Sequence, residues 1–170
     1  MATYVISDIH GQYDMFIDLL DKIQFQNTDT LYILGDILDR GTHPIKTIMK
    51  LMEMPNVICI VGNHEYMALE CLEFLMKEIT DMSIEELDEK MLDNLVTWQY
   101  NGSKSTIDEF RQLDSETRRD VIDFIKDFLI YEEIAVYLLI YAVMSVVQYT
   151  QVLSRSCSMN IHKKVAVATV

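Results

Sequence analysis

Three short segments of the sequence gather residues whose side chains bind metal ions or carry protons. Each segment contains glycine together with aspartate, histidine or both, and each follows an apolar run directly or after one residue. The segments are Asp8-Ile9-His10-Gly11, Gly35-Asp36-Ile37-Leu38-Asp39-Arg40-Gly41 and Gly62-Asn63-His64-Glu65. Carboxylate and imidazole ligands without thiolate favour Mn²⁺, Fe or Zn²⁺, with Mg²⁺ as a further choice, over a structural zinc held by cysteines. The segments therefore predict a metal centre that carries out chemistry.

Phosphoryl chemistry is what these residue types favour. A carboxylate such as Asp36 would bridge two cations, which lower the pKa of a shared water and stabilise in-line attack on phosphorus. Arg40 has a planar fork that binds two phosphate oxygens at once. His64 would protonate a leaving oxygen, while a carboxylate such as Asp39 would hold its tautomer and its charge.

The apolar runs in front of the three segments predict strands that are buried on both faces. They are residues 4–6, 31–34 and 57–61. Apolar residues between them recur at three- and four-residue steps, so the order is βαβαβ, which favours a parallel sheet with right-handed crossovers. Ligands bind beyond the carboxyl ends of such strands, so all three segments would meet at one rim. Because Asp8 and His10 are two residues apart, we expect them to face the same side of an extended backbone.

Residues from about 65 to 130 keep a helical period and predict a helical insertion on the α/β core. Thr106 and Glu109 have the spacing of a capping box, so a helix is expected to begin there, ahead of Phe110. A further helix is expected around residues 121–128.

Composition limits the classes of partner. The chain has 170 residues with 14 Lys or Arg and 27 Asp or Glu, a net charge of −13, and half of its residues are hydrophobic. This excludes a wholly disordered acidic chain and argues against nucleic acid or an anionic membrane as a partner. Cys59, Cys71 and Cys157 have no paired spacing and are expected to be free thiols. The chain enters its first strand almost directly after Met1, which predicts no signal peptide and a cytoplasmic location.

The three segments resemble the motifs of the calcineurin-type metallophosphoesterases, specifically the bacterial serine/threonine protein phosphatase branch. The matching residues are Asp8-x-His10-Gly11, Gly35-Asp36-x-x-Asp39-Arg40-Gly41 and Gly62-Asn63-His64-Glu65. Trp98 with Asn101-Gly102 resembles that branch's Trp-x-x-Asn-Gly-Gly stretch, with Ser103 in place of the second glycine. The similarity runs from about residue 3 to residue 133. It implies an α/β fold in which a β-sandwich is flanked by helices, so that the predicted parallel sheet is one part of it.

The resemblance also implies a set of metal ligands. Asp8, His10 and Asp36 would hold one divalent metal ion, and Asp36 would bridge to a second ion held partly by Asn63. Manganese is the expected metal, and Fe, Zn or Mg would also suit these ligands.

The remaining roles implied by the resemblance concern the substrate. Arg40, together with Asn63, would bind the phosphoryl group. His64, supported by Asp39, would assist the leaving oxygen. The nucleophile would be a metal-bound hydroxide, so no phosphoenzyme is expected. The substrate would be a phosphoprotein carrying phosphoserine or phosphothreonine, or a small phosphate monoester.

The last part of the chain differs in composition from the rest. All 27 acidic residues lie at or before Glu133, and residues 134–170 contain none. The uncharged stretch at residues 134–154 is long enough to span a bilayer, but its Val, Ile and Tyr content favours buried strands. We therefore divide the chain into a phosphoesterase core, residues 1–133, and a divergent apolar tail, residues 134–170, which would belong to the same domain or stand apart from it.

The tail also departs from the family's pattern. The family supplies two more histidines to the second metal, one from a Val-His-Ala-Gly type motif and one near a Gly-His. Residues 139–143 resemble the first motif, with Tyr141 in place of histidine and Val143 in place of glycine, and no Gly-His follows. We expect an incomplete or altered C-terminal half, through truncation or a change of reading frame, and a severely weakened second metal site.

Alternatives to the protein phosphatase remain open. Symmetrical diadenosine tetraphosphatases share the first two motifs, so a dinucleoside polyphosphate is the main rival substrate. Glu65 in the third motif favours the protein phosphatase branch. The chain would otherwise be an inactive family member that binds only one metal or a phosphorylated partner, or a fragment without a function of its own.

Overall fold

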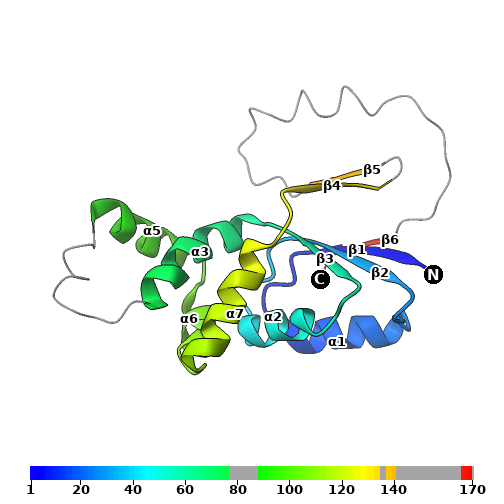
Figure 1. Ribbon diagram of the computed structural model, residues 1–170, viewed down its shortest axis with the longest axis horizontal. Helices are drawn as coiled ribbons and strands as arrows, with labels where there is room; N and C mark the ends of the chain where they lie inside the picture. Colours follow the sequence, from blue (N-terminus) through cyan, green and yellow to red (C-terminus); the bar gives the residue numbers. More distant parts are fainter. Residues whose placement is uncertain (77–87, 135–136, 141–165, 170) are drawn as a thin grey trace.

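A computed structural model describes residues 1–76, 88–134, 137–140 and 166–169 of the chain (Figure 1). Its larger sheet has four parallel strands in the order β3-β2-β1-β6. The strands are β1 (Thr3–Ser7), β2 (Thr30–Leu34), β3 (Val57–Ile60) and β6 (Ala166–Thr169). The predicted βαβαβ order is confirmed, and residues of the apolar tail add the edge strand β6 beside β1.

Two helices connect the first three strands and cover one face of the sheet, as Figure 1 shows. They are α1 (Tyr13–Lys22) and α2 (Pro44–Met52). Pro44 occupies the first turn of α2, where the missing N–H costs no hydrogen bond and the fixed φ suits a helix. These crossovers allow parallel pairing, which brings the carboxyl ends of all three strands to the same edge.

A second, antiparallel sheet lies on the opposite side of the larger one (Figure 1). It pairs β4 (Tyr131–Ile134) with β5 (Tyr137–Ile140). The chain reaches β4 along the edge of β3, because the Leu129 N–H donates to the Cys59 carbonyl at 2.9 Å and the Val61 N–H donates to the Leu129 carbonyl at 2.8 Å. The expected α/β fold with two sheets and flanking helices is thus confirmed. Tyr141 and Val143, where the tail departs from the family's histidine motif, lie outside the described residues.

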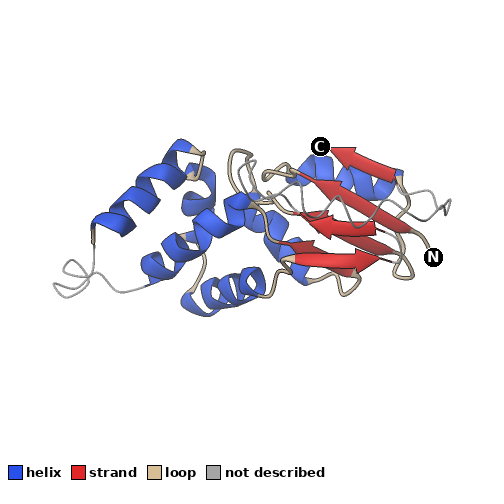
Figure 2. Cartoon of the chain, turned by 90° about the horizontal axis from the view of Figure 1, so that it is seen from above, coloured by secondary structure: helices blue, strands red, loops and turns tan. Residues whose placement is uncertain are grey.

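Four described helices follow β3 and gather at the end of the molecule away from the strands (Figure 2). They are α3 (Asn63–Met76), α5 (Glu89–Tyr100), α6 (Lys104–Phe110) and α7 (Ser115–Lys126). Their span agrees with the helical insertion expected at about residues 65–130, although the boundary of the core at residue 133 stays a prediction. Among the described helices, none is both long enough and apolar enough to cross a bilayer.

The predicted capping box at Thr106 is wrong. Helix α6 already begins at Lys104, so Thr106 lies inside the helix and is fully buried. Its hydroxyl donates to the Asp39 carboxylate at 2.6 Å rather than to its own helix. Glu109 caps a different helix, because its carboxylate accepts the backbone N–H groups of Ile45 and Lys46 at the start of α2. Tertiary hydrogen bonds therefore override the local capping pattern.

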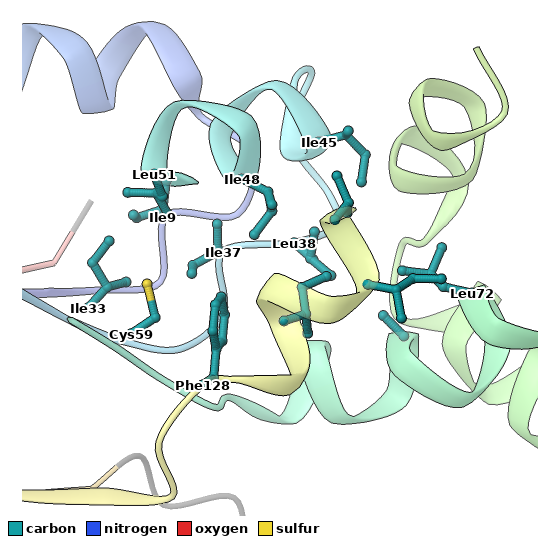
Figure 3. Close-up of a cluster of buried hydrophobic side chains, with 14 of the residues drawn as sticks. Ile9, Ile33, Ile37, Leu38, Ile45, Ile48, Leu51, Cys59, Leu72 and Phe128 are labelled. Atoms are coloured by element: carbon teal, nitrogen blue, oxygen red, sulfur yellow. The ribbon is translucent and has the colours of Figure 1, made fainter. Parts of the chain in front are cut away.

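One hydrophobic core joins the sheet to the helices. Figure 3 shows side chains from β2, α2, α3 and the segment after α7 packed together, among them Ile33, Ile48, Leu72 and Phe128. The first three are fully buried. Burial of an aliphatic side chain of this size contributes about 1.5–3 kcal/mol. The core continues directly beneath the strand ends, where Ile9, Ile37 and Leu38 are also fully buried.

Cys59 and Cys71 are buried and free, as predicted, and Cys157 lies outside the described residues. Burial raises the pKa of the Cys71 thiol to about 11 and raises that of Cys59 further.

These pKa values predict slow thiol chemistry. At about pH 8, roughly one Cys71 thiol in a thousand is ionised, and only the thiolate reacts. In a Cys157→Ser variant we expect both remaining thiols to resist an aromatic disulfide reagent in native buffer and to react at once in concentrated guanidinium chloride. Rapid reaction of either thiol in native buffer would contradict this burial.

Candidate functional site

The loops after the three strands lie against one another at the rim of the sheet. The backbone N–H of His10 donates to the Asp36 carbonyl at 2.8 Å, and the N–H of Gly11 donates to the Ile37 carbonyl at 2.8 Å. Only glycine fits where the third loop meets the second, since a Cβ on Gly62 would lie 2.4 Å from Asp36 Oδ1. The strand order thus brings the three sequence segments together, as the parallel topology predicted.

Left-handed backbone conformations are concentrated in these loops. Of the six described non-glycine residues with positive φ, five are residues expected to act in the site. They are Asp8 (57°), His10 (44°), Asp36 (52°), Asp39 (69°) and Arg40 (65°). The extended backbone assumed for Asp8 and His10 is therefore wrong, because β1 ends at Ser7. Such conformations cost about 1–3 kcal/mol each and persist only where the surroundings hold them.

His10, Asp36 and His64 form the group that can share a cation. Their ligand atoms all lie within 4.8 Å of one another. The Nδ1 of His10 lies 2.9 Å from the Leu38 carbonyl, which can only accept, so Nδ1 carries the proton and Nε2 keeps its lone pair. That Nε2 is 4.0 Å from Asp36 Oδ2. The hydrogen bond to Leu38 thus turns the ligating nitrogen of His10 toward the carboxylate.

His64 is fully buried and pairs with a fully buried carboxylate. Its Nδ1 lies 2.7 Å from Asp39 Oδ2, which also accepts the indole N–H of Trp98 at 2.9 Å. The other oxygen of Asp39 accepts the hydroxyl of Thr106. A carboxylate in this position fixes the tautomer of His64 with Nδ1 protonated and stabilises a positive charge on the ring.

Arg40 joins the two histidines. Its Nη1 donates to His10 Nε2 at 3.0 Å and its Nη2 donates to His64 Nε2 at 2.9 Å. Guanidinium has donors only, so both Nε2 atoms act as acceptors here. The backbone of Arg40 is held by Gly102, whose carbonyl accepts its N–H at 3.0 Å.

The two remaining expected ligands lie at the edge of the group. Asp8 is half-buried and immediately follows β1, but within the described residues it is not among the three that share 4.8 Å. Asn63 is half-buried at the start of α3, directly before His64. The structure thus places His64, which was expected to move a proton, within the group of three, and leaves Asp8, which was expected to bind metal, outside it.

Besides Trp98, two residues of the site had no role assigned from the sequence alone. Thr106 is one, since its spacing indicated a helix cap. Glu65 is the other: it is fully buried and accepts backbone N–H groups from the loops after β2 and β3. Burial raises the pKa of the Glu65 carboxyl, and the N–H groups of Leu38, Ile37 and Asp36 oppose that rise. The Gly-Asn-His-Glu motif was the only signal that marked Glu65.

Comparison with known proteins identifies the family. Residues 1–145 match the family described as calcineurin-like phosphoesterase. The chain belongs to this family. Its members use divalent metals, and the donor set of this chain fits such ions: one imidazole with an unprotonated Nε2, one carboxylate and a second imidazole within 4.8 Å.

The proteins similar to this chain include a curated relative and two solved structures. The symmetrical bis(5′-nucleosyl)-tetraphosphatase of Salmonella paratyphi A is 31% identical over 116 residues, which are 66% of this chain and 41% of that protein. The chain thus spans about two fifths of the length of such curated relatives. A metallophosphoesterase from Sphaerobacter thermophilus has a TM-score of 0.48 at 17% identity, over 80% of this chain and 44% of that one. A serine/threonine phosphatase from Saccharomyces cerevisiae has a TM-score of 0.41 at 17% identity, over 81% and 40%.

Thr106 provides a test of the network around Asp39. Its hydroxyl donates to Asp39 Oδ1 and accepts the Asp39 backbone N–H at 3.0 Å, so Thr106→Val leaves a buried carboxylate oxygen and a buried N–H unpaired. We expect a loss of about 1–3 kcal/mol in the free energy of unfolding, measured in urea through the fluorescence of Trp98, the single tryptophan.

Thr47→Val is the matched control. Thr47 is equally buried, but its hydroxyl donates to the His43 carbonyl, which still accepts the Thr47 backbone N–H after the change. If both variants lose the same free energy of unfolding, the hydrogen bonds of Thr106 to Asp39 add no stability beyond that of any buried threonine.

Proposed function

We propose that this calcineurin-like phosphoesterase is a metal-dependent enzyme that hydrolyses phosphate monoesters, with phosphoserine and phosphothreonine as its substrate class. The single observation that carries the proposal is the group formed by His10, Asp36 and His64 at the rim of the sheet, with Arg40 donating to both rings. The Gly-Asn-His-Glu motif and the Trp98 stretch support the choice of the protein phosphatase branch.

Metal binding is assigned to the strand ends. Asp8, His10 and Asp36 would hold one divalent ion, with Mn²⁺ as the proposed metal, and Asn63 would share a second ion with Asp36. A bound ion would supply Lewis-acid polarisation of the phosphoryl group and activation of water. The positive φ of Asp8, His10 and Asp36 supports this assignment, because strained backbone is retained where function requires it.

His64 is proposed to protonate the leaving oxygen. With Nδ1 hydrogen-bonded to Asp39, only Nε2 is available to carry a proton into the site. Asp39 is fully buried and accepts the Trp98 indole N–H and the Thr106 hydroxyl, so it stays in place and stabilises the imidazolium form of His64. Trp98 and Thr106 would therefore affect catalysis only indirectly, because they hold Asp39, which in turn holds the His64 ring.

Arg40 is proposed to bind the phosphoryl group. Arg40 is an exposed residue, and its two terminal nitrogens donate to two different acceptors, His10 Nε2 and His64 Nε2. The same pair of donors matches two oxygens of a phosphoryl group. Binding substrate would exchange imidazole acceptors for anionic ones, which form stronger hydrogen bonds with a cationic donor.

A dinucleoside tetraphosphate is the second candidate substrate, because the curated relatives at 31% identity carry that activity in their names. Comparing a phosphopeptide with a dinucleoside tetraphosphate at equal concentration separates the two. Faster release of phosphate from the peptide supports the main proposal, and faster cleavage of the tetraphosphate supports the second.

Asp36→Asn tests the function. Loss of the carboxylate charge from the shared group should abolish both Mn²⁺ binding and Mn²⁺-dependent hydrolysis of an aryl phosphate, measured by calorimetry and by release of the phenol. Asp120→Asn, an exposed change on α7, is the control and should behave as the parent chain. Parent-like metal affinity in Asp36→Asn would refute the assignment, and a parent chain that binds one ion without hydrolysis would be an inactive family member.

His64→Asn separates a proton donor from a metal ligand. We expect turnover of the aryl phosphate to fall by about 10²–10⁴-fold, the usual contribution of general acid catalysis, with bound metal per chain unchanged. The measurement is metal analysis of the purified variant beside its steady-state kinetics. Loss of metal in proportion to activity would make His64 a ligand, a role that its position in the group of three also permits.

A further inference from the structure

Glu65 has a carboxylate whose acceptor positions are all used by backbone. The side chain is fully buried in the first turn of α3. Its Oε2 accepts the N–H groups of Asp36 at 2.8 Å and Gly62 at 3.0 Å, and its Oε1 accepts those of Ile37 at 2.8 Å and Leu38 at 3.0 Å. A carboxylate offers about four acceptor positions, so none remains for a substrate or a cation.

These four donors belong to two different loops of the rim. Gly62 follows β3, whereas Asp36 and Leu38 follow β2, so one side chain holds both loops at a fixed separation. The missing side chain of Gly62 makes the contact possible, because a Cβ there would lie 2.6 Å from Glu65 Oε2. Glu65 therefore acts on backbone that no regular strand pairing holds.

The backbone that Glu65 holds carries a ligand. Asp36 has φ 52°, a left-handed conformation that is uncommon outside glycine and costs free energy. The N–H of Asp36 donates to Glu65 and its carbonyl accepts the N–H of His10, so both of its backbone polar groups are fixed. These two bonds fix the backbone from which the Asp36 carboxylate projects, and the N–H of His64 donates to its Oδ1 at 3.1 Å.

Glu65 is also connected to His10, through hydrogen bonds of the Leu38 backbone. The Leu38 N–H donates to Glu65 Oε1, and the Leu38 carbonyl accepts the Nδ1–H of His10 at 2.9 Å. One residue thus links the buried carboxylate to the imidazole whose Nε2 faces Asp36. Groups that orient metal-binding histidines through such bonds change metal affinity by about 10–100-fold when they are altered.

We propose that Glu65 is the positioning residue of the metal centre, which sets cation affinity by fixing the Asp36 backbone and, through Leu38, the ring of His10. The inference rests on the proposed function, because it assumes that His10 and Asp36 bind a cation. It assigns Glu65 no contact with substrate or metal.

Glu65→Gln tests the inference with little change of shape. The amide NH₂ group replaces one acceptor oxygen and faces two N–H donors, so two of the four bonds are lost whichever way the amide turns. We expect the dissociation constant for Mn²⁺, measured by titration followed by electron paramagnetic resonance, to rise about 10–100-fold. The folded state is checked by Trp98 fluorescence.

Glu109→Gln is the matched control. Glu109 also accepts two backbone N–H groups, those of Ile45 and Lys46, and pairs with His43 at 2.8 Å, but these bonds cap α2 and do not join the loop after β2 to the loop after β3. We expect this variant to lower the melting temperature while Mn²⁺ affinity stays within about threefold of the parent chain, a change smaller than that expected for groups that orient ligands.

The outcomes separate the two proposals. A parent chain that binds no Mn²⁺ refutes the proposed function. A parent chain that binds Mn²⁺ while folded Glu65→Gln binds it equally well overturns the role of Glu65 alone. If Glu65→Gln is unfolded, Glu65→Asp decides, because it keeps the charge but is one methylene too short to reach both loops. Folded Glu65→Asp with parent-like Mn²⁺ affinity would overturn the role, and weakened affinity would support it.

Discussion

Taking a carboxyl group out of water costs free energy unless hydrogen bonds replace its hydration, and this chain buries two such groups beneath the rim of the sheet. Asp39 and Glu65 are both fully buried. Asp39 receives an indole N–H, a hydroxyl and the Nδ1–H of His64, whereas Glu65 receives four backbone N–H groups. Because these donors come from different elements, satisfying the two carboxylates requires the loops after β2 and β3 to meet the helices in one arrangement.

That requirement explains why unfavourable backbone conformations persist at the rim. Asp36, Asp39 and Arg40 all have positive φ within one loop, and bonds to Glu65, Thr106 and Gly102 hold each of their N–H groups. A loop held at three points loses the freedom to relax into more favourable dihedral angles. Rigid strand ends beneath it complete the support, so the loop presents Asp36 and Arg40 on the same side as His10 and His64.

The sequence allowed prediction of what depends on period and topology. Apolar runs of strand length and helical repeats between them determine a parallel sheet, and its geometry alone brings His10, Asp36 and His64 to one edge. Prediction failed where a residue's partner is distant in sequence: Thr106 bonds to Asp39, 67 positions away, although its local spacing matched a helix cap. It also failed for Asp8 and His10, because alternation of side chains holds only in extended backbone and β1 ends at Ser7. Glu65 had no predicted role because its bonds go to backbone, which leaves no pattern of residue types.

The position of Arg40 links the metal and phosphate sites of the proposed enzyme. The Nε2 of His10 has one lone pair, which accepts Arg40 Nη1 at 3.0 Å, and the same lone pair is the one that a cation would use. The guanidinium and a cation therefore cannot both bind His10. A cation held by His10 and Asp36 would free the Arg40 Nη1 donor, next to the Nη2 donor that bonds to His64, and the phosphoryl group of the proposed substrate would lie there. The Arg40 guanidinium and the cation thus compete for the His10 ring when no substrate is bound. With a phosphoryl group present, each of them would bind a different phosphoryl oxygen, and the competition would end.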